Sequence, residues 1–286
     1  MKITNAQRAE ILTQALPYIQ EYNDKIIVVK YGGNAMVNEE LKRQVMGDIV
    51  LLSLVGVKVV LVHGGGPEIT DLLSKVGKKS DFVNGLRVTD RETVDYAVMS
   101  LAGKVNKSLV NLLETMGGSA IGISGIDGRL IEAKIKNPAL GYVGEITNVN
   151  IKPILDLLDC GYIPVVSTLG CDREGCVYNI NADTAAAYIA GALHAECMIA
   201  MTDITGILRD RNDPDSLITE IDISDAQKLF DDGIISGGMI PKVECCISAI
   251  ERGVGKVFIL DGRTPHSILV EVLTDEGAGT MVVNRK

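Results

Sequence analysis

Two lysines of this sequence stand next to paired glycines. Lys30 ends the apolar run 26–29 and is followed by Gly32 and Gly33, and Lys242 ends the stretch "SGGMIPK". Burying a lone ammonium group is unfavourable, and two adjacent glycines cost conformational entropy on folding. Backbone amides that no side chain shields, together with a lysine, form an environment that suits phosphate groups. The two stretches therefore predict a site for a phosphorylated ligand.

Two more turns have the same form. The stretch "LVHGGGPEI" (61–69) joins an apolar strand, three glycines and a proline at a helix start, and "TDITGIL" (202–208) also follows an apolar run. In open α/β sheets, ligands bind beyond the carboxyl ends of the strands, so the four turns can meet in one crevice. A tight turn without a ligand would explain any one of them, but four in comparable positions favour a phosphate site. Neither G-x-x-x-x-G-K-[ST] nor G-x-G-x-x-G is present.

Three further polar residues are candidates for the same crevice. Arg87 lies between apolar residues in "NGLRV" and needs an anionic partner if it is buried, but a surface arginine fits the pattern equally well. Asp183 in "NINADTAA" either caps the helix that starts there or faces the crevice and pairs with the lysines. His63 ends a strand, where a histidine is more often structural than catalytic.

The elements that must position these residues alternate along the chain. Strands separated by helix-length segments predict βαβ units and a mainly parallel sheet. Apolar runs predict strands at 26–30, 57–63, 120–124, 162–167 and 197–202, and the last clear strand at 256–260. Helical periodicity predicts helices after Pro67 and at 39–56, 90–116, 151–160, 183–193, 224–232 and 240–252, with hairpins at 129–149 and 171–181.

A separate amphipathic helix is predicted over residues 4–22. Thr4 and Gln7 form a capping box, and Pro17 inside the pattern should kink the helix. The apolar face carries Ile11, Leu12, Ala15, Leu16 and Ile19.

Composition excludes several classes of protein. The chain has 286 residues and a net charge of −9, which argues against a nucleic-acid or anionic-membrane surface. Apolar residues make up 47% and aromatic residues 4%, which is typical of a parallel sheet covered by helices. The N-terminus lacks the apolar core of a signal peptide, and the six cysteines and three histidines show no metal-ligand spacing. We expect a cytoplasmic protein with reduced thiols, without a metal site and without a nucleic-acid or membrane partner.

Six motifs of this chain resemble, in order, those of the amino acid kinase family. They are "VVKYGGNAM", "LVHGGGPEI", "NGLRVTD", "YNINADTAA", "TDITGIL" and "GGMIPKV", and the resemblance extends from about residue 24 to 283. The combination of "NGLRVT" with "NINAD" is most similar to the acetylglutamate kinases of that family. The resemblance implies an α/β fold, an αβα three-layer sandwich on a mainly parallel open sheet with an extra N-terminal helix.

The resemblance also implies an activity and a division of the chain. ATP, with Mg²⁺ held mainly by its phosphates, would phosphorylate the side-chain carboxylate of N-acetyl-L-glutamate in arginine biosynthesis. Residues 23–170 would form the lobe that binds acetylglutamate, and residues 171–286 the lobe that binds ATP. Residues 1–22 would form a kinked helix for oligomerisation and regulation.

Matched residue by residue, the resemblance assigns three groups of site residues. The catalytic residues would be Lys30 and Lys242, which stabilise the transferring phosphoryl group, and Asp183, which holds both lysines. The substrate would be bound by Gly65, Gly66, Arg87 at its α-carboxylate and Asn179 at its acetamido group. The nucleotide and its phosphates would be bound by Gly32, Gly33, Thr202, Asp203, Gly206, Gly237 and Gly238. These positions show no departure from the family pattern.

The stretch "HSILVEVLTDEGAGTMV" (266–282) resembles the ending of arginine-inhibited acetylglutamate kinases, which also carry an N-terminal helix. The resemblance implies feedback inhibition by L-arginine and a homohexamer, a trimer of dimers whose N-terminal helices interlace. The arginine site would contain Tyr18, His266, Glu271, Glu276, Gly277 and Gly279. A helix that packs only on its own subunit is the alternative.

Three functional classes stay open from the sequence. The first is the kinase described above. The second is another acyl-phosphate or phosphate kinase of the same fold, such as an aspartokinase. We expect no trailing regulatory domain after residue 286, and this counts against an aspartokinase. The third is a non-catalytic arginine sensor or scaffold, which the retention of Lys30, Lys242 and Asp183 disfavours. A Rossmann dehydrogenase is weaker still, because the dinucleotide fingerprint is missing.

Overall fold

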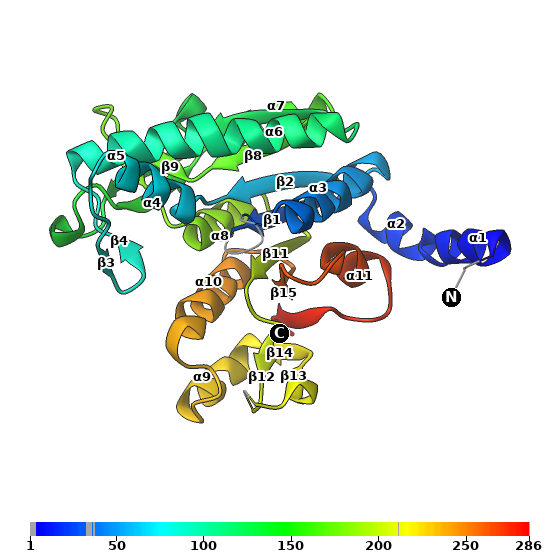
Figure 1. Ribbon diagram of the computed structural model, residues 1–286. Coiled ribbons are helices and arrows are strands. Elements are labelled where there is room, and N and C mark those ends of the chain that lie inside the picture. Colours follow the sequence, from blue (N-terminus) through cyan, green and yellow to red (C-terminus); the bar gives the residue numbers. More distant parts are fainter. Residues whose placement is uncertain (1–3, 33–35, 37, 211, 286) are drawn as a thin grey trace.

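An eight-stranded sheet forms the middle layer of the protein (Figure 1). The structure is a computed structural model that describes residues 4–32, 36, 38–210 and 212–285. The strand order is β14-β16-β15-β11-β1-β2-β8-β5, and all neighbours run parallel except β15 and β16. The strands are β1 (Ile26–Tyr31), β2 (Lys58–His63), β5 (Ala120–Ser124), β8 (Ile163–Ser167), β11 (Cys197–Thr202), β14 (Glu220–Asp222), β15 (Lys256–Asp261) and β16 (Gly279–Val283). The prediction of a mainly parallel open sheet is confirmed.

Helices cover both faces of this sheet, so the fold is the predicted αβα sandwich. One face carries α7 (Lys152–Asp159), α8 (Ala182–Ala192) and α10 (Ile240–Glu251), and the other carries α3 (Glu39–Leu54), α6 (Asn106–Thr115) and α11 (Ser267–Leu273). Side chains of a strand alternate between the two faces, so Val28 packs in one core and its neighbours Ile27 and Val29 pack in the other. Because both faces are buried, the central strands are apolar at nearly every position.

Smaller elements complete the fold around the main sheet. A second sheet has the order β10-β9-β6-β7, and two hairpins, β3–β4 and β12–β13, stand apart from both sheets. These strands are β3 (Phe82–Val83), β4 (Leu86–Arg87), β6 (Ile131–Ile135), β7 (Gly144–Val149), β9 (Leu169–Cys171), β10 (Val177–Asn179), β12 (Ile207–Leu208) and β13 (Leu217–Ile218). The hairpins predicted at 129–149 and 171–181 correspond to β6–β7 and β9–β10. The lobe boundary expected near residue 170 falls in β9.

The remaining helices are short. They are α4 (Gly66–Lys75), α5 (Arg91–Val98), α9 (Ile223–Asp231), the π-helix η2 (Met99–Val105) and the 3-10 helices η3 (Asp127–Arg129), η4 (Pro138–Leu140), η5 (Pro214–Ser216) and η6 (Gly237–Met239). Among the helices that the structure describes, none combines the length and the apolar character needed to cross a membrane.

Two expectations from the sequence need correction. The strand at 256–260 is not the last, because residues 279–283 form β16 between β15 and β14. This glycine-flanked segment has a weak strand signal and is a strand because distant strands supply its backbone partners. The helix predicted over 90–116 is interrupted by the π-helix η2, a rare element that local periodicity does not reveal.

The N-terminal segment is the kinked helix that the sequence predicts. α1 (Asn5–Gln14) starts with the capping box of Thr4 and Gln7. α2 (Leu16–Tyr22) starts beside Pro17, because the proline ring would clash with the carbonyl four residues earlier if one helix continued through it.

The two parts of this segment differ in burial. α1 buries none of its residues, and Ile11 and Leu12 on its apolar face are 53% and 74% exposed. Figure 1 shows α1 extending away from the rest of the molecule. α2 packs on α11 of its own chain and buries Tyr22. The apolar face of α1 is therefore left without a partner in the described part of a single chain.

A contact with a buried carboxylate joins α3 to the start of α11. Asp48 on α3 is 1% exposed, and its Oδ1 lies 2.6 Å from Nδ1 of His266. Burial raises the pKa of Asp48 to about 6, and the hydrogen bond with His266 opposes that rise. His266 has a φ of +56°, which is uncommon for a residue other than glycine. The contact therefore holds an unusual turn against a helix far away in the sequence.

We expect Asp48→Asn to stabilise the fold more at alkaline than at acidic pH. An unfolded aspartate titrates near pH ~3.9, whereas folded Asp48 titrates near 6, so the folded state binds more protons in that window. The contribution of Asp48 to the free energy of unfolding therefore falls as pH rises from 4 to 6, and asparagine removes that fall. Thermal unfolding at pH 8 should show a gain of about 1–3 kcal/mol, which should shrink at pH 5.

Asp24→Asn is a control of opposite sign, because a hydrogen bond from Lys58 lowers the pKa of Asp24. Asp24→Asn should lose, not gain, stability relative to the unaltered protein as pH rises. A gain from Asp48→Asn that is equal at pH 5 and pH 8 would show that ionisation of Asp48 is not its cause.

Candidate active site

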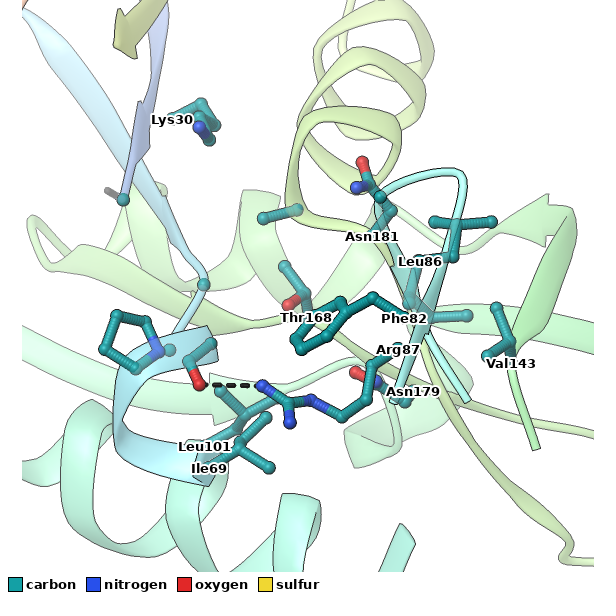
Figure 2. Close-up of a pocket in the computed structure, with 18 residues that line it drawn as sticks. Lys30, Ile69, Phe82, Leu86, Arg87, Leu101, Val143, Thr168, Asn179 and Asn181 are labelled. Atoms are coloured by element: carbon teal, nitrogen blue, oxygen red, sulfur yellow. Dashed lines mark hydrogen bonds between the residues drawn. The ribbon is translucent and has the colours of Figure 1, made fainter. Parts of the chain in front are cut away.

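The carboxyl ends of the central strands open into a cavity of about 250 Å³. Its walls come from Lys30 at the end of β1, the loop 64–67 after β2, the β3–β4 hairpin, β10 and the start of α8 (Figure 2). In the sheet, β2 is the neighbour of β1 on one side and β11 is its neighbour on the other side. The cavity thus lies near the point where the strand order reverses, which is where open α/β sheets bind ligands.

A buried ion pair ends β1. The Nζ atom of Lys30 lies 2.9 Å from Oδ1 of Asp183 and donates to the carbonyl of Met201 at 3.4 Å. Lys30 is only 6% exposed. Desolvation would raise the pKa of Asp183, but the charge of Lys30, with a smaller effect from Lys242, holds it below its ordinary value. Asp183 is therefore the anion that compensates the buried ammonium group.

Asp183 is free for this ion pair because another residue caps its helix. Asn181 is the N-cap of α8, and its Oδ1 accepts a hydrogen bond from the Thr184 N–H at 3.0 Å. Asp183 lies in the first turn, where the helix dipole also favours a carboxylate. Of the two alternatives that the sequence left open, the ion pair with lysine is the one observed.

The cavity continues into two others and forms one crevice. A space of about 460 Å³ shares Leu86 and Asn181 with the first cavity and also borders Asp183. A third space of about 530 Å³ shares Gly238 and Lys242 with the second. Two of the three predicted catalytic residues, Asp183 and Lys242, therefore border the middle of the crevice. The third, Lys30, lines the first cavity and pairs with Asp183.

Arg87 reaches the first cavity from β4 and is 6% exposed. Its Nη2 donates to the Gly66 carbonyl at 2.8 Å, drawn as a dashed line in Figure 2, and to the Thr70 hydroxyl at 2.9 Å. The guanidinium carbon lies 4.6 Å from the ring centroid of Phe82. Nη1 is buried and has no hydrogen-bond partner among the described residues, and burial lowers the pKa of Arg87. Such an incompletely paired cation fits an anionic ligand.

The other predicted substrate residues also line this first cavity. Gly65 and Gly66 come from the loop after β2, and a Cβ atom at Gly65 would lie 2.6 Å from Cδ2 of Leu101. Asn179 comes from β10, and its Nδ2 lies 3.5 Å from the Thr89 hydroxyl. The four predicted substrate residues are therefore together, although they lie far apart in the sequence.

The predicted nucleotide residues divide into several sets. Gly206, Gly237 and Gly238 line the third cavity beside Lys242, and Gly32 lines the first. Thr202 is buried and donates its hydroxyl to backbone carbonyls, so it shapes the turn after β11. Asp203 follows in that turn, and its charge acts on Arg263. Gly33 lies outside the described residues.

The predicted arginine residues gather at two ends of α11. Near its C-terminal end, Tyr18 of α2 donates to Asp275, and the Glu271 carboxylate accepts from the Ala278 N–H at 2.6 Å. Glu276 and Gly277 lie in the same loop, and Gly279 begins β16, where a Cβ atom would lie 2.0 Å from the Ile259 carbonyl. His266 lies at the other end of α11, against Asp48.

Several residues that line the crevice were not predicted from the sequence. Arg263 lines the third cavity, Lys136 lines the second, and Ile69, Phe82 and Leu101 give the first its apolar wall. Arg263 follows strand 256–260 in the turn "DGRT", so the rule that drew attention to the other turns could have found it. The apolar residues carry no such signal, because their sequence context is that of any core residue.

The third cavity is lined by groups that suit the phosphates of ATP. Glycines 206, 237 and 238 with Lys242 form a cradle open to phosphate, and a Cβ atom at Gly237 or Gly238 would meet no described atom within 4 Å. Within the described ranges, no three His, Cys, Asp or Glu side chains cluster closely enough to hold a metal ion. The glycines and Lys242 therefore fit the phosphates of a nucleotide.

Comparisons with known proteins agree on one family. The model of the amino acid kinase family matches residues 25–261. An acetylglutamate kinase of Brachyspira hyodysenteriae is 56% identical over 281 residues, which cover 98% of each chain. N-acetylglutamate synthase of Neisseria gonorrhoeae, solved with coenzyme A and N-acetyl-glutamate, has a TM-score of 0.83 at 26% identity and covers 97% of this chain and 64% of that one. The same enzyme with coenzyme A and L-arginine has a TM-score of 0.80 at 25% identity and covers 97% and 65%. The chain therefore belongs to the amino acid kinase family, and it is an ATP-dependent kinase.

Proposed function

We propose that this kinase phosphorylates the side-chain carboxylate of N-acetyl-L-glutamate, yielding N-acetyl-L-glutamyl 5-phosphate for arginine biosynthesis. The observation that carries the proposal is Arg87, a buried cation whose Nη1 has no hydrogen-bond partner within the described part of the chain, at a cavity that also contains Lys30. A small dicarboxylate can place one carboxylate on the arginine and direct the other toward the lysine. The 56% identity to a protein named acetylglutamate kinase supports the same substrate.

The crevice suggests how the two substrates divide the chain. The acetylglutamate would occupy the first cavity, with its α-carboxylate on Arg87 and its acetamido group near Asn179. ATP would occupy the third cavity, between the turn after β11 and the start of α10. Residues 23–170 then supply most of the acceptor site, and residues 171–286 most of the nucleotide site.

The chemistry needs alignment and charge neutralisation more than proton transfer. A carboxylate with a pKa near ~4.3 is already ionised at neutral pH, so it can attack the γ-phosphorus without a general base. Lys30 and Lys242 would stabilise the negative charge of the transferring phosphoryl group, and Asp183 would hold the lysines in place. Mg²⁺, held mainly by the ATP phosphates, would neutralise further charge on them.

An ATP-dependent hydroxamate assay tests the substrate. Hydroxylamine traps the acyl phosphate, so the assay reports the acceptor directly. N-acetylglutamate should give product, whereas glutamate and aspartate should give at least 10-fold less. Equal or greater activity with aspartate or glutamate would reject the proposed acceptor.

Lys30→Met and Lys242→Met should each lower kcat by about 10²–10³-fold and change both KM values much less. A charge that acts mainly in the transition state appears in kcat. Steady-state kinetics measure the effect. Lys104→Met is the matched control, because Lys104 is exposed and pairs only loosely with Asp71 at 3.8 Å. Near-normal kcat in both variants would remove the two lysines from the catalytic machinery.

Arg87→Lys should raise the KM for N-acetylglutamate by about 10-fold or more and leave the KM for ATP within about 2-fold. Lysine keeps the charge but loses the planar fork that reaches the Gly66 carbonyl and the ligand together. Arg91→Lys is a control, because its guanidinium stacks 5.6 Å from the Tyr142 ring, outside the cavity lining. A parallel rise in the KM for ATP would instead assign Arg87 to the nucleotide.

We propose in addition that L-arginine inhibits this kinase and that α1 links subunits into a hexamer, a trimer of dimers. The unpartnered apolar face of α1 supports the linkage, since a short isolated helix is unstable in water. The contact of Tyr18 with Asp275 supports a regulatory site between α2 and the loop after α11. The structural similarity to an enzyme solved with L-arginine also supports it.

Deletion of residues 1–14 should leave a folded, active kinase of smaller oligomeric size that arginine no longer inhibits. The deletion removes α1, which buries no residue, and spares the contacts of α2. An effector acts only by binding one state of an assembly better than another, so uncoupling the subunits should abolish inhibition. Sedimentation and activity with and without arginine measure both effects.

A point variant repeats this test without shortening the chain. Leu12→Glu places a charge on the apolar face and should act like the deletion, whereas Gln14→Glu on the same helix should change neither size nor inhibition. A deleted protein of unchanged size that is still inhibited by arginine would refute this role of α1.

A further inference from the structure

A buried polar network lies beneath the glycine loop that follows β2. His63 is fully buried, and its Nδ1 lies 2.8 Å from the carbonyl of Gly64. Its Nε2 lies 3.1 Å from Nδ2 of Asn106, the first residue of α6. Asn106 is 1% exposed and contacts two further strands, at the Val165 carbonyl of β8 (2.8 Å) and the Ile123 carbonyl of β5 (3.3 Å). One amide thus connects three neighbouring strands of the sheet.

The neighbours of Asn106 determine the orientation of its amide. Lys107 Nζ can only donate, and it lies 3.1 Å from the atom assigned as Oδ1. The carbonyls of Val165 and Ile123 can only accept, and they face Nδ2. A flipped amide would place donor against donor and acceptor against acceptor. The group that faces His63 is therefore an N–H donor.

The tautomer of His63 follows from its two contacts. The Asn106 amide nitrogen that faces Nε2 can only donate, so a proton on Nε2 would place donor against donor. Nε2 therefore carries a lone pair and no proton. Because the Gly64 carbonyl can only accept, Nδ1 carries the proton and donates to it. Burial lowers the pKa of His63 to about 4, which agrees with a neutral ring at physiological pH.

The anchored carbonyl fixes the direction of the next amide. The N–H of Gly64 donates to the Tyr31 carbonyl on β1 at 3.1 Å, so the residue is held on both sides. In a trans peptide the C=O and N–H groups point in opposite directions, so the N–H of Gly65 points away from His63. Gly65 is buried and lines the first cavity, and its N–H donates to no carbonyl in the described loops and caps. Buried backbone N–H groups are normally paired, so this amide is available to an acceptor that enters the cavity.

We propose that His63, held by Asn106 as the neutral Nδ1–H tautomer, is a positioning residue that anchors the Gly64 carbonyl and turns the Gly65 amide toward the acceptor carboxylate in the crevice. The inference deepens the proposed function and rests on it for the identity of the acceptor. The role needs no proton transfer by His63, so the histidine would not touch the reacting atoms.

Two substitutions separate positioning from packing. The side-chain amide of asparagine can donate from nearly the place of Nδ1, whereas leucine fills the space without a donor. We expect His63→Leu to lower kcat for N-acetylglutamate by about 10–100-fold, with the KM for ATP within about 2-fold, and His63→Asn to keep kcat within about 5-fold. A packing role predicts the reverse order, because asparagine leaves a larger void than leucine. Equal losses in both variants, or normal kcat in His63→Leu, would overturn the proposal.

Nitrogen NMR of the unaltered protein tests the tautomer without relying on the variants to fold. The chain has three histidines, so ¹⁵N-labelled rings can be assigned by replacing His194 and His266 in turn. His63 should show a protonated Nδ1 and an unprotonated Nε2 from pH 8 down to pH 5.5. A protonated Nε2 in that range would refute the proposal. Failure of the proposed function is a separate result, because it appears as no hydroxamate from the unaltered protein.

Discussion

The site depends on the ion pair between Lys30 and Asp183. An ammonium group at the end of a central strand has little access to water, and only a nearby carboxylate makes its burial tolerable. That carboxylate comes from α8, more than 150 residues later, so the pair requires the chain to return to β1 from the other side. Asn181 is part of the same arrangement, because it caps α8 and leaves Asp183 free. The position of the cation thus determines how the strand, the helix and its cap must meet.

The protein is acidic overall and still presents a crevice suited to anions. The net charge of −9 is distributed over the surface, whereas Lys30, Lys242 and Arg87 converge at the carboxyl edge of the sheet. The three cations have different surroundings. Lys30 pairs with a carboxylate, and Lys242 lies in the first turn of α10. Arg87 donates to a carbonyl and a hydroxyl, and its Nη1 has no partner among the residues that the structure describes. Local geometry therefore outweighs net charge in deciding what this surface can bind.

The interrupted helix of residues 91–115 supports the glycine loop after β2 at two points. Its π-helical part places Leu101 against Gly65, where a Cβ atom would leave too little room. Asn106 directly follows the π-helix and lies under the same loop, where it contacts His63 and two other strands. One helix therefore contacts the loop from the cavity side and supports it from the core side. Elements of this kind often lie at functional sites, and here the irregular turn aligns two residues that a regular helix would rotate apart.

The sequence by itself determined the sandwich, most of its strands and helices, and the turns that carry the site. Buried parallel strands are apolar throughout, and lysine or glycine at their ends is a local signal. Three features depended on tertiary structure. β16 is a strand because β15 and β14 supply its backbone partners. Asp183 pairs with a lysine of β1, and Asn181 caps α8 in its place. His266 lies against Asp48, at the opposite end of α11 from Tyr18. The apolar wall formed by Ile69, Phe82 and Leu101 could not be predicted from the sequence either. Periodicity reports which face of an element is buried, whereas only the packed structure decides which distant residue lies against it.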